Sequence, residues 1–335
     1  MTVESTPNRS SAQRLERWAR VALPFVVSGG LFVYLFARID VRVALDYLTA
    51  DVLIRFIGPL LLFNFVTLAI EAQCLHRVAR ANPADAAPLT RTTAARIKAA
   101  CYLLGILNYA LGAAGLSVLL RRRSGASLAA AAGMVFLVSL FDVGSVLTWV
   151  GAGAALLQAD TFGVRLGLVG LLIAAIVSGF VFLRAPISLG PLEPIRELDI
   201  LRAPRTAPTS LLVEIGILRL LFVGCFVLLA RALFWAFEIE VGAMQLAVNV
   251  GLMLVVSALP IAAGGLGTGQ IVFVQLFSGL APDAQLLSAS IVFSIGLIIT
   301  RALIGLSFAP EFTREALAAT RTVAVPPSGP ENSES

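Results

Sequence analysis

The chain has 335 residues, of which 58% are hydrophobic and only 13% charged, and its mean hydropathy is +0.91. This composition excludes a water-soluble globular protein, in which about 25% of residues are charged. The net charge of +5 comes from arginines between the apolar stretches, which favours contact with anionic lipid headgroups and gives no sign of a nucleic-acid partner.

Long apolar stretches predict an all-α integral membrane protein, since a helix needs about 20 mostly apolar residues to cross a bilayer. Six stretches meet or approach this length: residues 21–37, 52–75, 128–150, 164–183, 210–233 and 286–309. Arg14, Arg17 and Arg20 precede the first of them, and no small-residue cleavage site follows it directly. We therefore interpret residues 21–37 as an uncleaved first span and not as a signal peptide.

Two further apolar stretches are broken by residues that oppose a continuous helix. Residues 99–120 contain Gly105, Gly112 and Gly115, and residues 244–280 are interrupted between Pro260 and Gly269. Neither stretch is typical of one straight span.

Basic loops indicate how the broken stretches are threaded, because Lys and Arg collect on the cytoplasmic side. If residues 99–120 crossed fully, the run Arg121, Arg122 and Arg123 would lie outside, and the acidic loop with Glu238 and Glu240 would lie inside. If each broken stretch enters the membrane and returns to the side from which it entered, the arginine run lies inside and the acidic loop lies outside. Both positions satisfy the positive-inside rule. The sequence thus predicts about six spans plus two re-entrant elements, with both termini on the cytoplasmic side of the plasma (inner) membrane.

This threading repeats itself in opposite orientation, which predicts two inverted repeats. We expect one membrane domain at residues 12–309, with repeats at about 12–158 and 159–309, and polar tails at 1–11 and 310–335 that are disordered or mostly so. A short echo between residues 110–117 and 258–267 is consistent with the repeat. Inverted repeats with broken helices are common in secondary transporters, so the topology points towards translocation.

The broken elements are the first candidate binding site. Irregular backbone at membrane depth is tolerated where protein buries it or it lines a cavity, and N–H groups at the start of a helix near Gln270 could meet an anionic headgroup. The alternative is a tight turn near the outer surface. The second-half candidates are Pro260, Gly264, Gly265 and Gly267, and their first-half counterparts are Asn108, Gly112 and Gly115. Arg121, Arg122 and Arg123 follow the latter and either attract headgroup phosphate or serve only as a topology signal.

Ionisable residues within predicted spans form the second candidate site, because each costs a few kcal/mol or more at the bilayer centre unless it has a partner. Their placement predicts a central polar cavity for a headgroup or a proton relay; structural ion pairs are the alternative. These residues are Asp142, Glu214, Arg219 and Arg301. We expect Glu71, Arg55 and Arg231 to extend towards the membrane interfaces instead.

Enzymatic, metal and cofactor signatures are not indicated by the sequence. Glu71 and His76 have no second histidine at helical spacing, as a zinc protease would require. The cysteines have unrelated spacings and predict neither a disulfide framework nor a metal site. We therefore expect no catalytic residue, metal ligand or cofactor.

Two motifs resemble a known family. The sequence Leu-Pro-Ile-Ala-Ala-Gly-Gly-Leu-Gly at residues 259–267 is similar to the Pro-x-x-x-Gly-Gly-Leu-Gly signature in the transmembrane (flippase) region of lysylphosphatidylglycerol synthases and their stand-alone relatives. Residues 108–127, followed by Asp142, resemble the other characteristic block. The resemblance extends from the first span to Ala309 and implies a stand-alone member, without the soluble synthase domain, that moves phospholipid between leaflets.

Two departures from the family pattern concern the cargo. Relatives often carry an Arg-Glu pair after Gly-Gly-Leu-Gly and a Glu after the first-half glycine, where this chain has Thr268, Gly269, Gln270 and Leu116. We therefore expect translocation of a lipid or lipid-linked substrate whose identity stays open, with a phospholipid as partner and possible homo-oligomers. The alternatives are a non-transporting membrane partner of a cell-envelope enzyme and an ion-coupled transporter of a soluble solute.

Overall fold

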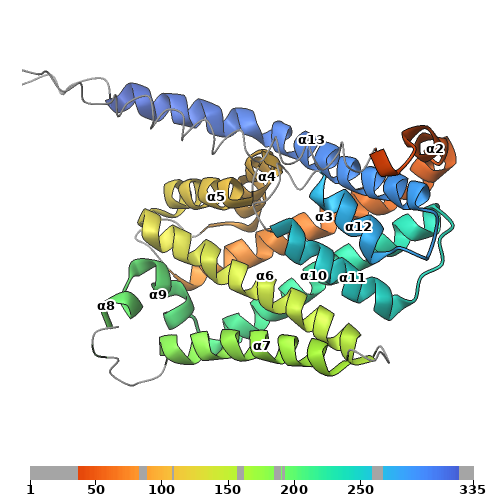
Figure 1. The fold of residues 1–335 in the computed structure, drawn as a ribbon. Coiled ribbons are helices and arrows are strands. Elements are labelled where there is room, and N and C mark those ends of the chain that lie inside the picture. The colour runs from red at the N-terminus through yellow and green to blue at the C-terminus, as the bar shows by residue number, and fades with distance from the viewer. Residues whose placement is uncertain are drawn as a thin grey trace, which may run out of the picture.

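A computed structural model describes residues 37–82, 89–107, 109–156, 162–184, 190, 193–258 and 267–323. These residues form helices joined by short connections, with no strand among them (Figure 1). Four helical segments are long and apolar enough to cross a membrane: Ala50–Ala81, Leu128–Gly153, Thr209–Ala236 and Asp283–Pro310. The prediction of an all-α membrane protein is therefore confirmed.

The helices follow the predicted apolar stretches closely. In chain order they are α2 (Val41–Asp46), α3 (Ala50–Ala81), α4 (Arg91–Leu107), α5 (Tyr109–Ser124), α6 (Leu128–Leu156), α7 (Phe162–Arg184), α8 (Glu193–Arg196), α9 (Asp199–Thr206), α10 (Thr209–Ala236), α11 (Ala243–Ala258), α12 (Thr268–Leu276) and α13 (Asp283–Val323). The predicted first span, residues 21–37, lies outside the described residues except for Ala37. Helix α13 continues beyond residue 309, where the predicted membrane domain ended, because residues 314–320 are mostly good helix formers.

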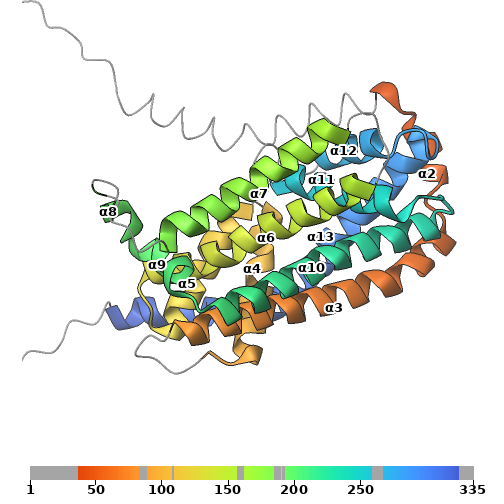
Figure 2. The ribbon, with the colours of Figure 1, turned by 90° about the horizontal axis from the view of Figure 1, so that it is seen from below.

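The long helices run side by side, with α3 packed along α10 and α6 lying between α7 and α10 (Figure 2). Helix α4 packs against α13, and α11 packs against α6. If α3, α4, α5 and α6 are matched with α10, α11, α12 and α13, each contact within or between these groups has a counterpart. The helix contacts are thus arranged in pairs around the α3–α10 contact.

Glycines allow the close helix contacts on both sides of this arrangement, as small residues do in membrane bundles. A Cβ atom on Gly305 of α13 would lie 2.8 Å from Leu103 Cγ of α4. A Cβ atom on Gly251 of α11 would lie 2.5 Å from Val150 Cγ2 of α6. Neither position has room for a larger side chain without a local shift.

The first broken stretch is an antiparallel pair of helices, α4 and α5. A Cβ atom on Gly112 would lie 2.9 Å from Gly105 Cα, and one on Gly115 would overlap Leu104 Cδ1. The two helices therefore pack with their backbones in near contact. At the far end of α5, Gly125 adopts a φ of +70° and donates its N–H to Arg121 O, which ends the helix.

Two apolar clusters fill the bundle at different depths. The first joins Phe56 and Phe63 of α3 with residues of α10, α12 and α13, and the second joins Leu75 and Val78 of α3 with residues of α4, α5, α6 and α10. Between them on α3 lie the buried polar residues Asn64, Thr67 and Glu71. A polar layer thus crosses the bundle between two apolar layers.

The outer surface of the bundle is also apolar. Phe65 of α3 is 73% exposed, and Leu228 of α10 is 69% exposed. Similar exposed aliphatic side chains continue along α3, α10 and α13. In a membrane protein such side chains face lipid, so they have no need of a protein partner.

Candidate functional site

The polar layer is built around an ion pair between α6 and α10. Arg219 donates from Nε and Nη2 to Asp142 Oδ1. The Arg219 guanidinium also lies 4.1 Å from the centre of the Phe222 ring, which adds a cation–π contact. Arg219 is only 3% exposed, so these partners stabilise its buried charge in place of water.

A second set of charged and polar side chains joins α3 to α4. Lys98 Nζ lies 2.8 Å from Glu71 Oε1, and Tyr102 Oη donates to Glu71 Oε2 over 2.6 Å. Glu71 is buried, so our expectation that it extends to an interface was wrong. Lys98 and Tyr102 were not among our candidate site residues, although their spacing of four places them on one helical face.

Arg301 of α13 lies beside this set. Its guanidinium carbon is 5.3 Å from the centre of the Tyr102 ring and 5.9 Å from that of Phe226. Its Nε is buried and has no hydrogen-bond partner. Within the described part of the chain, no carboxylate lies within salt-bridge distance of Arg301, although Glu71 interacts with it electrostatically.

Next to Arg301 on α13, Thr300 connects the layer to α3. Asn64 Nδ2 donates to Thr300 Oγ1 over 3.0 Å and to Leu60 O over 2.8 Å. The other amide atom, Asn64 Oδ1, is buried without a donor, and the residue is only 2% exposed. The layer therefore contains both a donor and an acceptor that no described protein group satisfies.

Among the described residues of the layer, Glu71 lies beside Lys98 and Asp142 beside Arg219. Arg301 is then the cation of this part of the chain that has no carboxylate at salt-bridge distance. Because a buried charge is costly without a partner, Arg301 favours an anionic ligand at the level of the polar layer.

Glu214, a predicted member of the same cavity, lies in a separate cluster. Its Oε2 accepts from Arg77 Nε and Nη2 at 2.7 and 2.6 Å, and its Oε1 accepts from Gln73 at 3.2 Å. Arg219 is five positions after Glu214 on α10, so the two side chains point to different neighbours. The structure thus brings Asp142 and Arg219 together and leaves Glu214 beside α3.

The glycine-rich candidates are described only in part. Asn108, Pro260, Gly264 and Gly265 lie outside the described residues. Gly267 precedes α12 with a φ of +89°, a left-handed conformation that favours glycine.

The N–H group of Gly267 donates to the Gln270 side chain over 2.6 Å, and Gln270 Nε2 donates to Ser294 Oγ of α13 over 3.1 Å. Gln270, which we expected near the start of this helix, therefore binds the N–H at the helix entrance itself.

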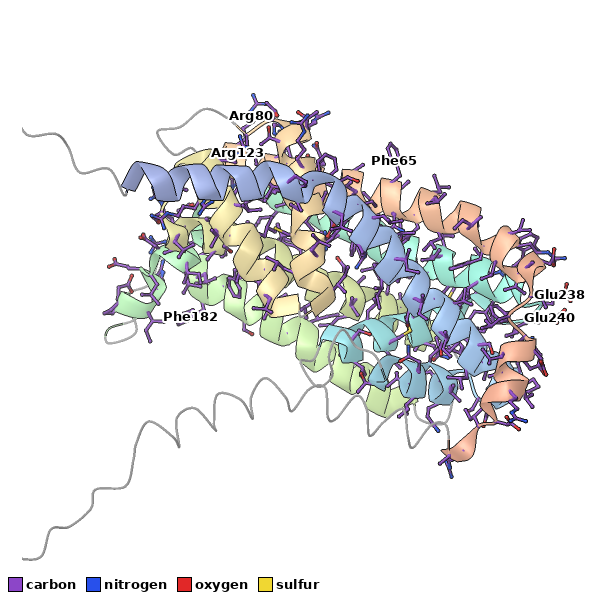
Figure 3. All side chains as sticks on the ribbon, turned by 90° about the horizontal axis from the view of Figure 1, so that it is seen from above. Phe65, Arg80, Arg123, Phe182, Glu238 and Glu240 are labelled. Carbon is purple, nitrogen blue, oxygen red and sulfur yellow. The ribbon has the colours of Figure 1, made fainter. Side chains whose placement is uncertain are left out.

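Two pairs of labelled residues with opposite charge lie towards opposite ends of the bundle (Figure 3). Arg80 of α3 and Arg123 of α5 lie towards one end, called the basic end here, and Arg121 and Arg122 share the last turn of α5 with Arg123. Glu238 and Glu240, in the connection after α10, lie at the other, the acidic end. Phe65 lies between them and points away from the helices.

Metal binding finds no support in this part of the chain: no three His, Cys, Asp or Glu side chains gather within the described ranges. Comparison with protein-family models, with curated proteins and with solved structures finds no match to this chain.

Proposed function

We propose that the protein moves a phospholipid or lipid-linked substrate with an anionic headgroup between the two leaflets. The observation that carries this proposal is Arg301, a cation between the apolar clusters with a buried, unsatisfied Nε and no carboxylate at salt-bridge distance among the described residues. A phosphate group is the natural ligand for a guanidinium, since it offers several acceptor oxygens in the geometry that Arg prefers.

The paired helix contacts support the inverted-repeat part of the proposal. Helix α4 of the α4–α5 pair contacts α13, and α11 of the α11–α12 pair contacts α6, so each pair packs against a long helix of the other half. Transporters with inverted repeats bind substrate near the membrane centre, where the repeats meet. Here the groups that meet are Asp142 and Glu71 from the first half and Arg219 and Arg301 from the second.

The α4–α5 hairpin supports the proposed re-entrant threading. Both its outer ends carry basic residues, Arg91 at the start of α4 and Arg121, Arg122 and Arg123 at the end of α5. The positive-inside rule then assigns the basic end to the cytoplasm and the acidic end to the outer side. With the first span included, this gives the proposed six spans, two re-entrant elements and cytoplasmic termini.

Leaflet exchange in reconstituted liposomes tests the function. Labelled phospholipids with anionic and zwitterionic headgroups would be followed by chemical quenching of the outer leaflet, with the wild-type protein and with Arg301→Gln. Because a hydrogen bond to a charged group contributes about 1.5–3 kcal/mol, exchange of the anionic lipid should slow by roughly tenfold or more in the variant.

Arg80→Gln is the matched control, since Arg80 is exposed at the basic end and outside the charged layer. This control should exchange lipid at the wild-type rate. The proposal fails if the wild-type protein exchanges none of the lipids tested, or if Arg301→Gln behaves like Arg80→Gln.

A further inference from the structure

A pocket at the acidic end lies apart from the charged layer. It has a volume of about 750 Å³ and is lined by the start of α3, the end of α10 and the connection to α11. This volume is within the range of small-ligand sites, about 300–1,000 Å³. Charged residues of both signs line it: Arg55, Arg231, Glu238 and Glu240.

One of the two cations in this pocket is already neutralised. Arg55 Nη2 lies 2.7 Å from Asp51 Oδ2, and Arg55 Nη1 donates to Glu238 Oε1 over 3.0 Å. Its guanidinium also lies 5.8 Å from the centre of the Trp235 ring. Arg55 therefore forms part of the pocket wall and is not available as the main ligand for an anion.

The backbone conformation of Glu238 fixes the position of this part of the pocket wall. Glu238 adopts a φ of +58° directly after the end of α10, and Ile239 donates to Phe234 O over 2.9 Å. Glycine usually occupies this position of a helix end. A glutamate there is strained, and its carboxylate is what holds Arg55.

Arg231 and Glu240 remain without a charged partner in the described part of the chain. Arg231 donates from Nη1 to Val241 O over 2.9 Å, which leaves other N–H groups of the guanidinium free to bind. Glu240 is exposed and has no hydrogen bond or ion pair among the described residues. The pocket thus offers one available cation and one available anion.

We propose that this pocket binds a zwitterionic headgroup that carries a phosphate and a primary amine, as phosphoethanolamine does. The phosphate binds Arg231, and the ammonium group binds Glu240. A purely anionic headgroup would be repelled by Glu240 and would leave it unpaired. A purely cationic ligand would be repelled by Arg231 and would leave that residue unpaired.

The surroundings of the pocket favour a lipid as the source of this headgroup. Leu228, Arg231 and Trp235 share one face of α10, at spacings of three and four residues. Leu228 is 69% exposed and Trp235 is 61% exposed, so an apolar strip leads directly from the pocket along the lipid-facing surface. Exposed Trp and Arg at a helix end are typical of the membrane interface.

This inference does not depend on the translocation function, and binding measurements test it directly. The full-length protein in detergent micelles would be titrated with short-chain phosphatidylethanolamine, short-chain phosphatidylglycerol and phosphoethanolamine without acyl chains. Because a hydrogen bond between charged groups strengthens binding, the wild-type protein should bind the ethanolamine lipid roughly tenfold more tightly than the glycerol lipid.

Variants identify the groups that recognise each end of the headgroup. Glu240→Gln should remove the preference for the amine without weakening binding of the glycerol lipid, and Arg231→Gln should weaken both lipids. Glu197→Gln and Arg80→Gln are matched controls, because both residues are exposed and outside the pocket lining. Arg301→Gln should bind like the wild type even if leaflet exchange is lost.

Equal binding of the two lipids by the wild-type protein would overturn the proposal, as would pocket variants that bind like the controls. If free phosphoethanolamine binds more weakly than phosphatidylethanolamine, the ligand of the pocket is a membrane lipid. If phosphoethanolamine and phosphatidylethanolamine bind equally, the ligand is a soluble zwitterion. Either result supports recognition of a phosphate and an amine at this site.

Discussion

Replacing Asp142 by asparagine should destabilise the protein by about 3 kcal/mol, since breaking a buried ion pair by removing one partner costs about 3–5 kcal/mol. Asparagine retains the size of the side chain and one acceptor oxygen, so the change is chiefly the lost charge. Arg219 is 3% exposed and would remain charged, because a guanidinium cannot release its proton in a protein. The nearby Glu71 and the Phe222 ring offset part of the loss, which favours the lower end of this range.

The reverse change, Arg219→Gln, should cost less, about 1–2 kcal/mol. The Asp142 side chain is 25% exposed. A carboxylate that has lost its partner can also avoid the cost of a buried charge by binding a proton. The double variant Asp142→Leu/Arg219→Met should be near neutral, since apolar residues of similar volume often replace a buried pair without loss. The expected order of stability is therefore double variant, Arg219→Gln, then Asp142→Asn.

Thermal unfolding in detergent micelles, followed by intrinsic fluorescence, measures this order. A loss of about 3 kcal/mol should lower the Tm by roughly 6 °C or more, whereas Arg80→Gln at the exposed basic end should leave it within 1–2 °C, as surface changes of under ~0.5 kcal/mol do. If Asp142→Asn is no more destabilising than Arg80→Gln, the ion pair is hydrated and not buried. If the double variant loses as much stability as the two single variants together, the two side chains do not interact as a buried pair.

Three further changes test packing, hydrogen bonding and backbone conformation in the same unfolding assay. Gly305→Ala should cost about 1–3 kcal/mol by forcing α13 away from α4, while Gly58→Ala, which meets no atom within 4 Å, should gain up to about 1 kcal/mol; equal effects would contradict the close contact. Tyr102→Phe should cost about 1–3 kcal/mol, because Glu71 loses a buried donor; an unchanged Tm would show that water replaces the hydroxyl. Glu238→Gly should gain up to about 1 kcal/mol by relieving a left-handed residue, whereas Glu238→Ala should not; the same Tm for both would argue against strain.

Much of the fold can be predicted from the sequence because hydropathy is a local property. The predicted stretches at 52–75 and 210–233 lie within α3 and α10. The breaks in the other two stretches were also recognisable, since glycine and proline act on their own backbone. How far each helix continues past its apolar stretch was less predictable.

Glu71 shows why this matters for the candidate site. It lies near the end of the apolar stretch at 52–75, which suggested a position close to the interface. Helix α3 continues to Ala81, and Lys98 and Tyr102 of α4 pack against the same turn. The surroundings of Glu71 are therefore set by the neighbouring helix α4. The sequence of α3 alone does not show where α4 packs.

The pair of Asp142 and Arg219 was accessible only as two separate candidates. Each is an ionisable residue in an apolar stretch, which predicts that it needs a partner. The choice of partner depends on the packing of α6 against α10, and the alternative partner Glu214 lies on the same helix as Arg219. Tertiary packing thus decides which of two chemically equivalent carboxylates neutralises the arginine.

The division of charges between the halves constrains how the protein can work. Asp142, Glu71 and Lys98 come from the first half of the chain, and Arg219 and Arg301 come from the second, so the charged layer is also a contact between the two halves. Any movement that separates α6 from α10 must break the pair of Asp142 and Arg219, which costs several kcal/mol unless another anion replaces the carboxylate. If the protein translocates a lipid as proposed, a headgroup phosphate that enters beside Arg301 supplies that anion, and we expect an opening that is costly in the empty protein to become accessible with the headgroup bound. On the proposed function, Asp142→Asn should weaken the dependence of leaflet exchange on an anionic headgroup, and Arg301→Gln should weaken the binding of headgroup phosphate beside the pair.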